Sequence, residues 1–499
     1  MDYPNGEPHL GHAFEKVGAD CVARYKRLKG YETFLATGVD ENSLNVDRTA
    51  GAAGEDTQDF VDRMSPTFKS LWDHLNISAT EFVRTTEDRH VAAAQEFFRR
   101  AMDVGDIYKG KYEGWYCLSC ENYYLEADLD DGLCPVHATN PEWFSEENYF
   151  FSLSKYQDRL INHFEQNPNF VVPESRCNEV LNIVRSGLKD FSVSRSDAKW
   201  GIPVPGDPEQ VIYVWFDALI SYCTIVGFGC KDDSVFDRWW PADAHVIGKD
   251  ILRFHAIYWP AMLMSVGLPL PSQIVGHGWI DIAGEAMSKT RGVVLDPREI
   301  TQKYGVDPLR YYLLREVQFK GDGSFVWENL HRRYHSDLAN DMGNLLNRTV
   351  SMIERYCSGV LPEAKDPSNE DKVLFEAASR TWAIVDRCYS EWDFSEALSA
   401  VWVFVAAANR YVDATQPFRL AKDNSASDRL DTILVNLAES VRQIAVMIAP
   451  AMPHTAERVF SQLGAGNLSD GSWEEHSSWN VLAPGSLVPG GKPIFPRID

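Results

Sequence analysis

Apolar residues near the start of the chain recur at the spacing of a helix. A turn-forming run ends at Pro8, and Gly30 ends the helical pattern that follows it. Between them, the apolar residues at helical spacing are Leu10, Phe14, Val17, Cys21, Tyr25 and Leu28. His9-Leu10-Gly11-His12 therefore opens a helix and places two imidazoles on one face. Free N–H groups and the positive dipole end favour phosphate there, so we expect a nucleotide; two ordinary histidines at a helix start are the alternative.

The next patterns predict an α/β domain. Residues 31–37 read as a strand that delivers Asp40 to the sheet edge where ligands bind, and capping of the next helix is the alternative role for this carboxylate. Helical patterns follow at 57–75 and 85–104, the second opened by the box-like Thr85-x-x-Asp88. Residues 211–217 read as a buried strand with pocket-lining aromatics, and 245–248 as a strand that turns at glycine into a helix opened by Asp250.

The second half of the chain predicts a helical bundle. A short connector runs to about residue 329, and helical patterns continue almost to residue 451. Asn344 and Arg348 share a helix face, where Arg348 can bind or stack on an RNA base; a solvated face is the alternative. The tail from Ser461 is rich in glycine and proline and closes with a strand-like run at 493–495.

Charge and composition narrow the function. The net charge of −24 argues against non-specific coating of nucleic acid, although a local basic face can still bind one particular RNA. The longest apolar run is too short to cross a bilayer, and the N-terminus has neither a basic head nor an apolar stretch. We expect a cytoplasmic protein that binds no DNA and no membrane.

Cysteine spacing predicts a metal site. Nine cysteines in 499 residues do not indicate a secreted disulfide framework. Two short ligand pairs, each with a two-residue gap, can close a tetrahedron around one structural zinc: Cys117, Cys120, Cys134 and His137. Four unrelated side chains are the alternative.

A glycine-bounded run at 284–292 predicts a loop that presents Lys289. A lysine ammonium there can meet polyphosphate as a point charge, and a plain surface loop is the alternative.

Taken together, these motifs resemble the bacterial methionyl-tRNA synthetases, a class I family, over essentially the whole chain. The likeness rests on His9-Leu10-Gly11-His12, the cysteine and histidine knuckle, Tyr213-Val214-Trp215-Phe216-Asp217, Ala286-Met287-Ser288-Lys289-Thr290 and Asp337-Leu338-Ala339-Asn340. The resemblance implies that methionine and ATP form methionyl-adenylate, with magnesium accompanying ATP. The methionyl group then passes to initiator and elongator methionine tRNA.

The resemblance also implies roles for individual residues. His9, His12 and Lys289 would be catalytic. ATP would be bound by Gly11, Gly248, Asp250, Ser288 and Lys289. Methionine would be bound by Tyr3, Asp40, Arg195, Trp215, Tyr222, Ile251 and His255. The anticodon would be read by Asn344, Arg348 and Phe418.

The fold expected from patterns and resemblance is α/β, a doubly wound Rossmann-like catalytic domain with a zinc-knuckle insertion, followed by an all-α anticodon-binding bundle. We expect the catalytic domain at residues 1–105 and 211–295, and the insertion at 106–210 with its knuckle at about 112–143. A connector at 296–330, the bundle at 331–460 and a tail at 461–499 complete the chain.

Some positions depart from the family pattern. Ala286 replaces the first lysine of the loop, Asn42 stands where the family commonly has histidine, and Phe418 replaces the stacking tryptophan. Only eight residues precede His9 where the family has a β-strand, so we expect the natural protein to begin upstream of Met1. The alternative to an active synthetase is a synthetase-like protein that binds tRNA or nucleotide without charging.

Overall fold

The structure is a computed structural model of the 499-residue chain. It describes residues 1–117, 122–124, 126–136, 138–196, 198–230, 232, 234–282, 285–286 and 294–498. The chain forms two compact units, and the first contains Met1–Pro8, Phe34–Trp72 and Ala79–His277. The second contains His9–Thr33, Asp73–Ser78 and Gly278–Asp499.

The first unit is built on short parallel strands. Strand β1 (Ala36–Val39) pairs in parallel with β2 (Glu81–Arg84), and Asp2 forms a parallel bridge with Val39. A second parallel sheet has the order β11 (His245–Gly248), β12 (Ile274–His277) and β6 (Val171–Val172). The helices of this unit are α2 (Leu44–Ala53), α3 (Thr57–His74), α4 (Asp88–Asp103), α5 (Gln157–Gln166), α6 (Glu174–Arg185), α7 (Val214–Thr224), α8 (Ser234–Trp239) and α9 (Trp259–Ser265). Parallel strands and helices of this kind confirm the α/β class.

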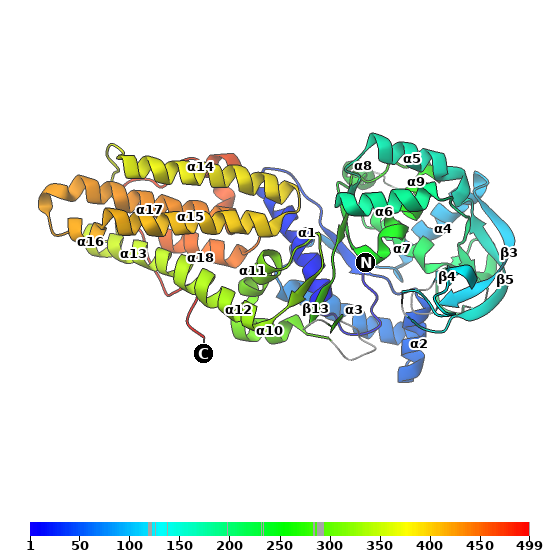
Figure 1. Ribbon diagram of the computed structural model, residues 1–499. Helices are drawn as coiled ribbons and strands as arrows, with labels where there is room; N and C mark the ends of the chain where they lie inside the picture. Colours follow the sequence, from blue (N-terminus) through cyan, green and yellow to red (C-terminus); the bar gives the residue numbers. More distant parts are fainter. Residues whose placement is uncertain are drawn as a thin grey trace. The chain divides into compact units, whose positions relative to one another are not determined.

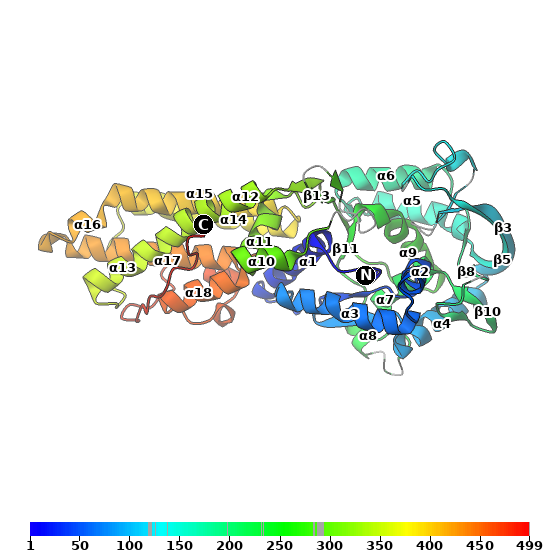
Figure 2. The same cartoon turned by 90° about the horizontal axis from the view of Figure 1, so that it is seen from below.

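A long antiparallel ribbon belongs to the same unit. Strands β3 (Ile107–Cys117) and β5 (Glu142–Phe151) pair along their length and curve side by side in both views (Figures 1 and 2). The sheet is completed by β4 (Asn122–Tyr124) and β7 (Phe191–Ser192). A separate three-stranded sheet contains β8 (Ser194–Arg195), β10 (Asp207–Ile212) and β9 (Pro203–Val204). The residues between β2 and β11 thus contain this ribbon, which carries Cys117 at the end of β3.

The second unit is mostly helical. The helices α14 (Asn369–Ser390), α15 (Phe394–Thr415) and α17 (Ser427–Ile448) lie side by side in Figure 1, and α13 (Asn344–Cys357) and α18 (Pro453–Leu463) lie along α17 in Figure 2. Its other elements are α1 (Leu10–Leu28), β13 (Ile280–Ile282), β14 (Glu285–Ala286), α10 (Pro297–Tyr304), α11 (Val306–Glu316), β15 (Gly323–Phe325), α12 (Trp327–Arg333), α16 (Pro417–Leu420) and α19 (Trp473–His476). The expected helical bundle is confirmed.

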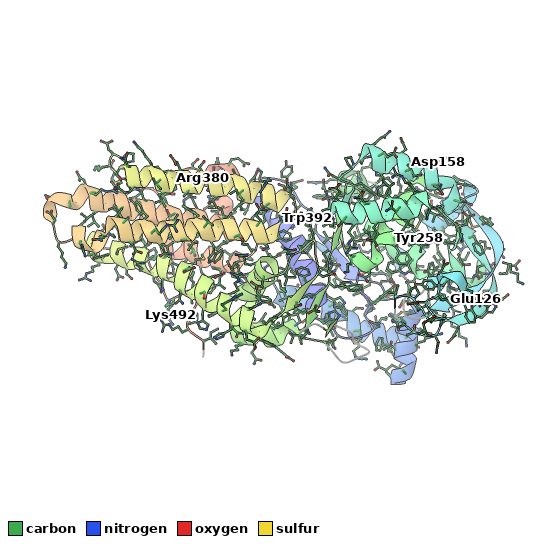
Figure 3. The ribbon with its side chains drawn as sticks, in the orientation of Figure 1. Glu126, Asp158, Tyr258, Arg380, Trp392 and Lys492 are labelled. Carbon is green, nitrogen blue, oxygen red and sulfur yellow. The ribbon has the colours of Figure 1, made fainter. Side chains whose placement is uncertain are left out.

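Helix α1 packs closely within this second unit. A side-chain carbon at Gly18 would overlap the ring of Phe319, so only glycine allows that ring to approach the helix backbone. The ring of Phe319 in turn stacks on Trp392, which is labelled in Figure 3, with centroids 6.2 Å apart and planes at 13°. The helix that begins at the two histidines is therefore anchored to the elements that follow β13.

Three sequence predictions about elements are wrong, each for a local reason. Residues 211–217 are not one strand, because β10 ends at Ile212 and α7 begins at Val214. Nearly every residue of α7 is buried, and a continuous apolar run does not distinguish a buried strand from a buried helix. Helix α4 begins at Asp88 rather than after Thr85, whose hydroxyl instead accepts a hydrogen bond from the backbone of Glu41.

The third wrong prediction concerns the tail. Residues 493–495 form no strand; instead the carbonyls of Pro493 and Ile494 accept hydrogen bonds from the Arg458 guanidinium. Phe495 packs its ring edge-on against Tyr334. The side chains of Ile494 and Phe495 are therefore buried, and the backbone of this segment bonds to an arginine side chain rather than to a neighbouring strand.

No helix in the described part of the chain combines the length and apolar character needed to cross a membrane.

Candidate active site and RNA-reading face

The histidine motif caps α1 as its spacing predicts. The backbone N–H of Gly11 donates to Nδ1 of His9 at 3.1 Å, and the N–H of His9 donates to Nδ1 of His12 at 3.1 Å. The two ring centroids lie 3.9 Å apart. Because both Nδ1 atoms accept, each neutral ring carries its proton on Nε2. The backbone N–H of Leu10 also has a partner, the Leu295 carbonyl at 3.0 Å, so the first turn of the helix contributes the two imidazole Nε2–H groups as donors.

The carboxylate expected at the strand end lies in a tightly held loop of the first unit. Asp40 follows β1 and is buried, and its backbone N–H donates to the carbonyl of Asp2 at 2.9 Å. The next residue, Glu41, is fully buried and accepts from Arg84 Nε at 2.7 Å and from the hydroxyl of Ser65. Ionic and hydrogen-bond contacts around Glu41 thus fix the backbone that carries Asp40.

Aromatic residues of the same unit form the expected apolar cluster. The indole of Trp215 stacks on Phe254 with centroids 3.9 Å apart and planes at 3°, and the ring of Tyr3 meets it edge-on at 6.2 Å. Tyr3 and Trp215 come from segments more than two hundred residues apart, so the fold brings together two residues that the resemblance assigns to one ligand. Stacked planar rings of this kind suit an uncharged, polarisable side chain.

A histidine faces this cluster. His255 Nδ1 donates to the Ile251 carbonyl at 3.0 Å, and its Nε2 lies 2.8 Å from the Tyr222 hydroxyl. Behind Tyr222, the ring of His245 stacks at 4.1 Å. Burial holds the pKa of His245 well below its ordinary value, so this ring is neutral at pH 7. The geometry therefore joins Tyr222, Ile251 and His255 in one wall.

The end of β11 makes a tight turn. A side-chain carbon on Gly248 would lie 2.6 Å from Asp250 Oδ1, so the Asp250 carboxylate occupies the space over a bare glycine backbone. The turn continues as a 3₁₀ segment at Lys249–Ile251. This places a glycine and a carboxylate together at the carboxyl end of a parallel strand, where ligands of such sheets bind.

A small, partly open cavity lies next to the Asp40 loop. Its lining includes Asn42, Trp200, Tyr213 and the buried Arg195. The Arg195 guanidinium lies 4.1 Å from the centroid of the Tyr213 ring and donates to the carbonyl of Ser194 at 2.7 Å. Arg195 is therefore held flat against an aromatic wall of this cavity.

Two of the four expected zinc ligands lie in the described part of the chain. Cys117 and Cys134 are buried thiols, and Thr139 contacts both segments: its hydroxyl lies 3.4 Å from Cys117 Sγ and its carbonyl accepts from the Cys134 backbone at 2.9 Å. Cys120 and His137 lie outside the described residues. Within those described, no three metal-binding side chains gather. Two buried thiols, whose segments Thr139 joins, are half of the four-ligand set expected from the sequence.

The expected loop residues Ser288 and Lys289 lie outside the described residues. The backbone of Ala286 is described, and it belongs to β14, which pairs antiparallel with β13.

The residues expected to read RNA lie on helices of the second unit. Asn344 and Arg348 lie one turn apart on α13, and Arg348 donates to Asp413 Oδ1 at 3.4 Å. The side chain of Arg348 is 41% exposed, so water screens this ion pair. Phe418, on α16, is 45% exposed. An exposed ring and an exposed guanidinium are the groups that stack on single-stranded bases.

Sequence reasoning missed the buried polar residues that hold these segments. In the first unit Asp217 is hydrogen-bonded to both His90 and Asn42, and in the second Asp20 and Arg310 form an ion pair. Their partners lie between 127 and 290 residues away in the sequence. The spacing of neighbouring residues therefore does not predict these contacts. A polar residue inside an apolar run, such as Asp217, is the one sequence feature that indicates a buried polar contact.

Comparison with known families gives two matches. The family described as tRNA synthetases class I (M) matches residues 1–139 and 125–350. The family described as the anticodon-binding domain of tRNA ligase matches residues 371–484.

Curated relatives match along the whole chain. The methionine–tRNA ligase of Caldanaerobacter subterraneus subsp. tengcongensis is 46% identical over 497 residues, spanning 100% of this chain and 78% of the relative. The methionine–tRNA ligase of Thermotoga maritima is 44% identical over 502 residues, spanning 100% of this chain and 79% of the relative.

Solved structures show the same likeness. The crystal structure of Mycobacterium tuberculosis methionyl-tRNA synthetase bound by methionyl-adenylate is 40% identical, with a TM-score of 0.95 over 99% of this chain and 98% of that one. The apo form of the same enzyme is 38% identical and has a TM-score of 0.88, covering 100% and 97% of the two chains.

Proposed function

Because this chain belongs to the class I methionyl-tRNA synthetases, we infer that it is a methionine–tRNA ligase, which uses ATP to join methionine to methionine tRNA. The observation that carries this function is the likeness, over nearly the whole chain, to a structure that holds methionyl-adenylate. In the first step a carboxylate oxygen of methionine attacks the α-phosphorus of ATP, and pyrophosphate leaves. In the second, a hydroxyl of the 3′-terminal ribose of tRNA attacks the adenylate carbonyl, and AMP leaves.

We propose that His9 and His12 act on ATP through their Nε2–H groups. Both rings are fixed by backbone N–H donors to their Nδ1 atoms, so the outward nitrogen of each neutral ring is a donor. Together with the helix N-terminus, these donors stabilise the negative charge that grows on the phosphates during adenylate formation. The proposed ATP-binding residues are Gly11, Gly248, Asp250, Ser288 and Lys289.

Lys289 is proposed to neutralise charge on the departing pyrophosphate. The family usually has a second lysine where this chain has Ala286, so Lys289 would supply this charge alone. A positioned cation of this kind acts mainly on the transition state, because that is where charge accumulates on the leaving group.

The methionine site is proposed in the first unit. Asp40 would bind the α-ammonium group as a buried carboxylate. The stacked indole of Trp215 and the hydrogen-bonded pair Tyr222 and His255 would surround the thioether, which gains from contact with aromatic rings. Tyr3, Arg195 and Ile251 complete the proposed site.

Two metals accompany the proposed function. ATP chemistry in this family implies a divalent cation, for which we propose magnesium. The buried thiols of Cys117 and Cys134 support one structural zinc with Cys120 and His137, because four protein ligands leave no position for a reacting water. The zinc would stabilise the fold of the knuckle, within the proposed insertion 106–210 and its knuckle at about 112–143.

For the anticodon we propose a face formed by Asn344, Arg348 and Phe418, in a domain at residues 331–460. The connector at 296–330 would join this domain to the catalytic domain, which would comprise residues 1–105 and 211–295. The tail at 461–499 would follow the anticodon-binding domain. The exposed ring and guanidinium support this role, because single-stranded bases bind by stacking and hydrogen bonding. Aminoacylation of tRNA takes place where translation does, so we propose a cytoplasmic location.

The test of the function is aminoacylation of purified methionine tRNA. Both initiator and elongator transcripts should accept labelled methionine from this enzyme, and a transcript with an altered anticodon should be charged poorly. Formation of methionyl-adenylate without any transfer to either tRNA would instead identify a protein that activates methionine but does not charge.

A further inference from the structure

One hydrogen bond joins the two segments that carry proposed methionine ligands. Asn42 Nδ2 donates to Asp217 Oδ2 at 2.7 Å, and both side chains are buried. Asp40 lies two residues before Asn42 in the loop after β1, and Trp215 lies two residues before Asp217 in the first turn of α7. The bond therefore links the loop of the proposed ammonium ligand to the helix of the proposed thioether ligand.

The Asp217 carboxylate is held from its other side as well. Its Oδ1 atom lies 2.5 Å from Nε2 of His90, a fully buried histidine on α4, whose Nδ1 lies 3.0 Å from the Thr224 hydroxyl. Helix α7 thus contacts His90 of α4 through two of its side chains, Asp217 near its N-terminal end and Thr224 at its C-terminal end. A carboxylate with partners on both oxygens has a fixed orientation, so it is a rigid anchor for Asn42.

The loop side of the bond is equally constrained. The second N–H of the Asn42 carboxamide donates to the carbonyl of Thr85 at 3.0 Å, while the Thr85 hydroxyl accepts from the Glu41 backbone at 2.8 Å. The carbonyl of Glu41 also accepts from the indole of Trp200 at 2.7 Å. The residues next to Asp40 on its C-terminal side therefore have little freedom of their own.

We propose that Asn42 and Asp217 are positioning residues that set the separation of Asp40 and Trp215 and so determine how tightly the enzyme binds methionine. This proposal rests on the proposed function. Neither residue is assigned to touch the substrate; they act through Asp40 and Trp215. The ATP ligands come from other segments, including the start of α1 and the end of β11, so loss of the bond should weaken methionine binding selectively.

The same contact explains a departure from the family pattern. Asn42 replaces a histidine, yet its carboxamide keeps an N–H donor directed at Asp217. Asn42 also lines the cavity that Arg195 and Tyr213 border. An Asn42→His variant restores the imidazole of the family pattern and supplies a ring N–H as the donor to Asp217.

The test measures KM for methionine and for ATP separately, by pyrophosphate exchange, in the full chain. Asn42→Ala should raise KM for methionine about tenfold, as expected for loss of a hydrogen bond to a buried carboxylate, and leave KM for ATP within about twofold. Asn42→His should stay within about threefold of wild type for both substrates. Asn162→Ala, on the exposed surface of α5, is the matched control and should change neither constant.

A second measurement separates positioning from general damage. Asn42→Ala and Asp217→Ala remove the same bond, so the double variant should raise KM for methionine no more than the larger single change, whereas independent damage would multiply the two effects. If the alanine variant does not fold, Asn42→Ser replaces it, since a serine hydroxyl is too short to reach Asp217. An unchanged KM for methionine, or equal rises in both constants, would overturn the proposal. Absence of methionine-dependent exchange in the wild type would refute the proposed function instead.

Discussion

Replacing Arg310 with methionine should destabilise the second unit strongly. Arg310 and its partner Asp20 are both fully buried, and the guanidinium donates to Asp20 Oδ2 at 2.6 Å. It also donates to the carbonyls of Ala451 at 2.8 Å, Pro450 at 3.1 Å and Leu75 at 3.2 Å. One side chain on α11 thereby joins α1, the segment after α3 and the turn between α17 and α18.

The magnitude follows from what the substitution leaves behind. Methionine fills part of the volume but donates no hydrogen bond, so the three carbonyls lose a donor and Asp20 loses its buried counter-ion. Breaking a buried ion pair from one side costs about 3–5 kcal/mol, against a total stability of about 5–15 kcal/mol. Arg24 and Ser78 still contact Asp20, which keeps the loss within this range.

Hydrogen exchange of the backbone amides of α1 measures this loss directly. A reduction of 3–5 kcal/mol in the free energy of opening should accelerate exchange by about two to three and a half orders of magnitude. The matched control is Arg99→Met, which removes an exposed ion pair with Glu96 on α4 and should leave exchange unchanged. An acceleration of less than about tenfold in Arg310→Met would refute the assigned role of the ion pair.

The pH dependence gives a second check on the same residue. Burial by itself raises the pKa of Asp20, but Arg310, Arg24 and the hydrogen bonds from Ser78 outweigh it and hold the pKa below its ordinary value. This carboxylate therefore stabilises the fold above about pH 4, and the contribution is lost as the pH falls through the lowered pKa. In Arg310→Met the pKa of Asp20 should be higher than in wild type, so acidification from pH 7 should narrow the stability difference between the two proteins.

Three further predictions concern the proposed sites. Metal analysis of the purified protein should find one zinc per chain, and a zinc-free folded protein would contradict the site formed by Cys117, Cys120, Cys134 and His137. Lys289→Ala should lower adenylate formation by roughly 10²-fold or more, because a preorganised charge on the leaving group is lost; near-normal exchange kinetics would count against that role. Arg348→Ala should weaken charging of methionine tRNA and leave pyrophosphate exchange intact, since base contacts act on tRNA alone. An equal loss of both activities would argue that Arg348 acts on the catalytic site.

The sequence predicts the parts of the fold that depend on local periodicity. The helix after His9 and the helices of the bundle are confirmed, because amphipathic spacing and terminating glycines act within a few residues. The strand at 245–248 is confirmed as β11, which ends at Gly248. The strand expected at 31–37 is shorter, since β1 begins only at Ala36, where its pairing with β2 begins.

Long-range contacts explain what the sequence could not predict. The strand β10 ends at Ile212 and helix α7 begins at Val214, within one apolar run. Because α7 is buried on nearly all sides, its residues are apolar throughout and show no helical periodicity. The bonds of Asn42 and Arg310 join segments far apart in the chain, so neither residue forms a motif with its neighbours. Motif spacing thus identifies candidate chemistry, while the residues that hold it in place emerge only from the structure.

Pyrophosphate exchange with a panel of amino acids tests the central claim most directly. The assay reports formation of the aminoacyl-adenylate and needs no tRNA, so it isolates the amino acid specificity of the proposed site. Methionine should support rapid ATP-dependent exchange, and leucine, isoleucine and valine should support far less, because they lack the thioether that the aromatic wall at Trp215 and Tyr222 is proposed to bind. Exchange driven better by one of those amino acids, or no exchange with methionine, would contradict the account.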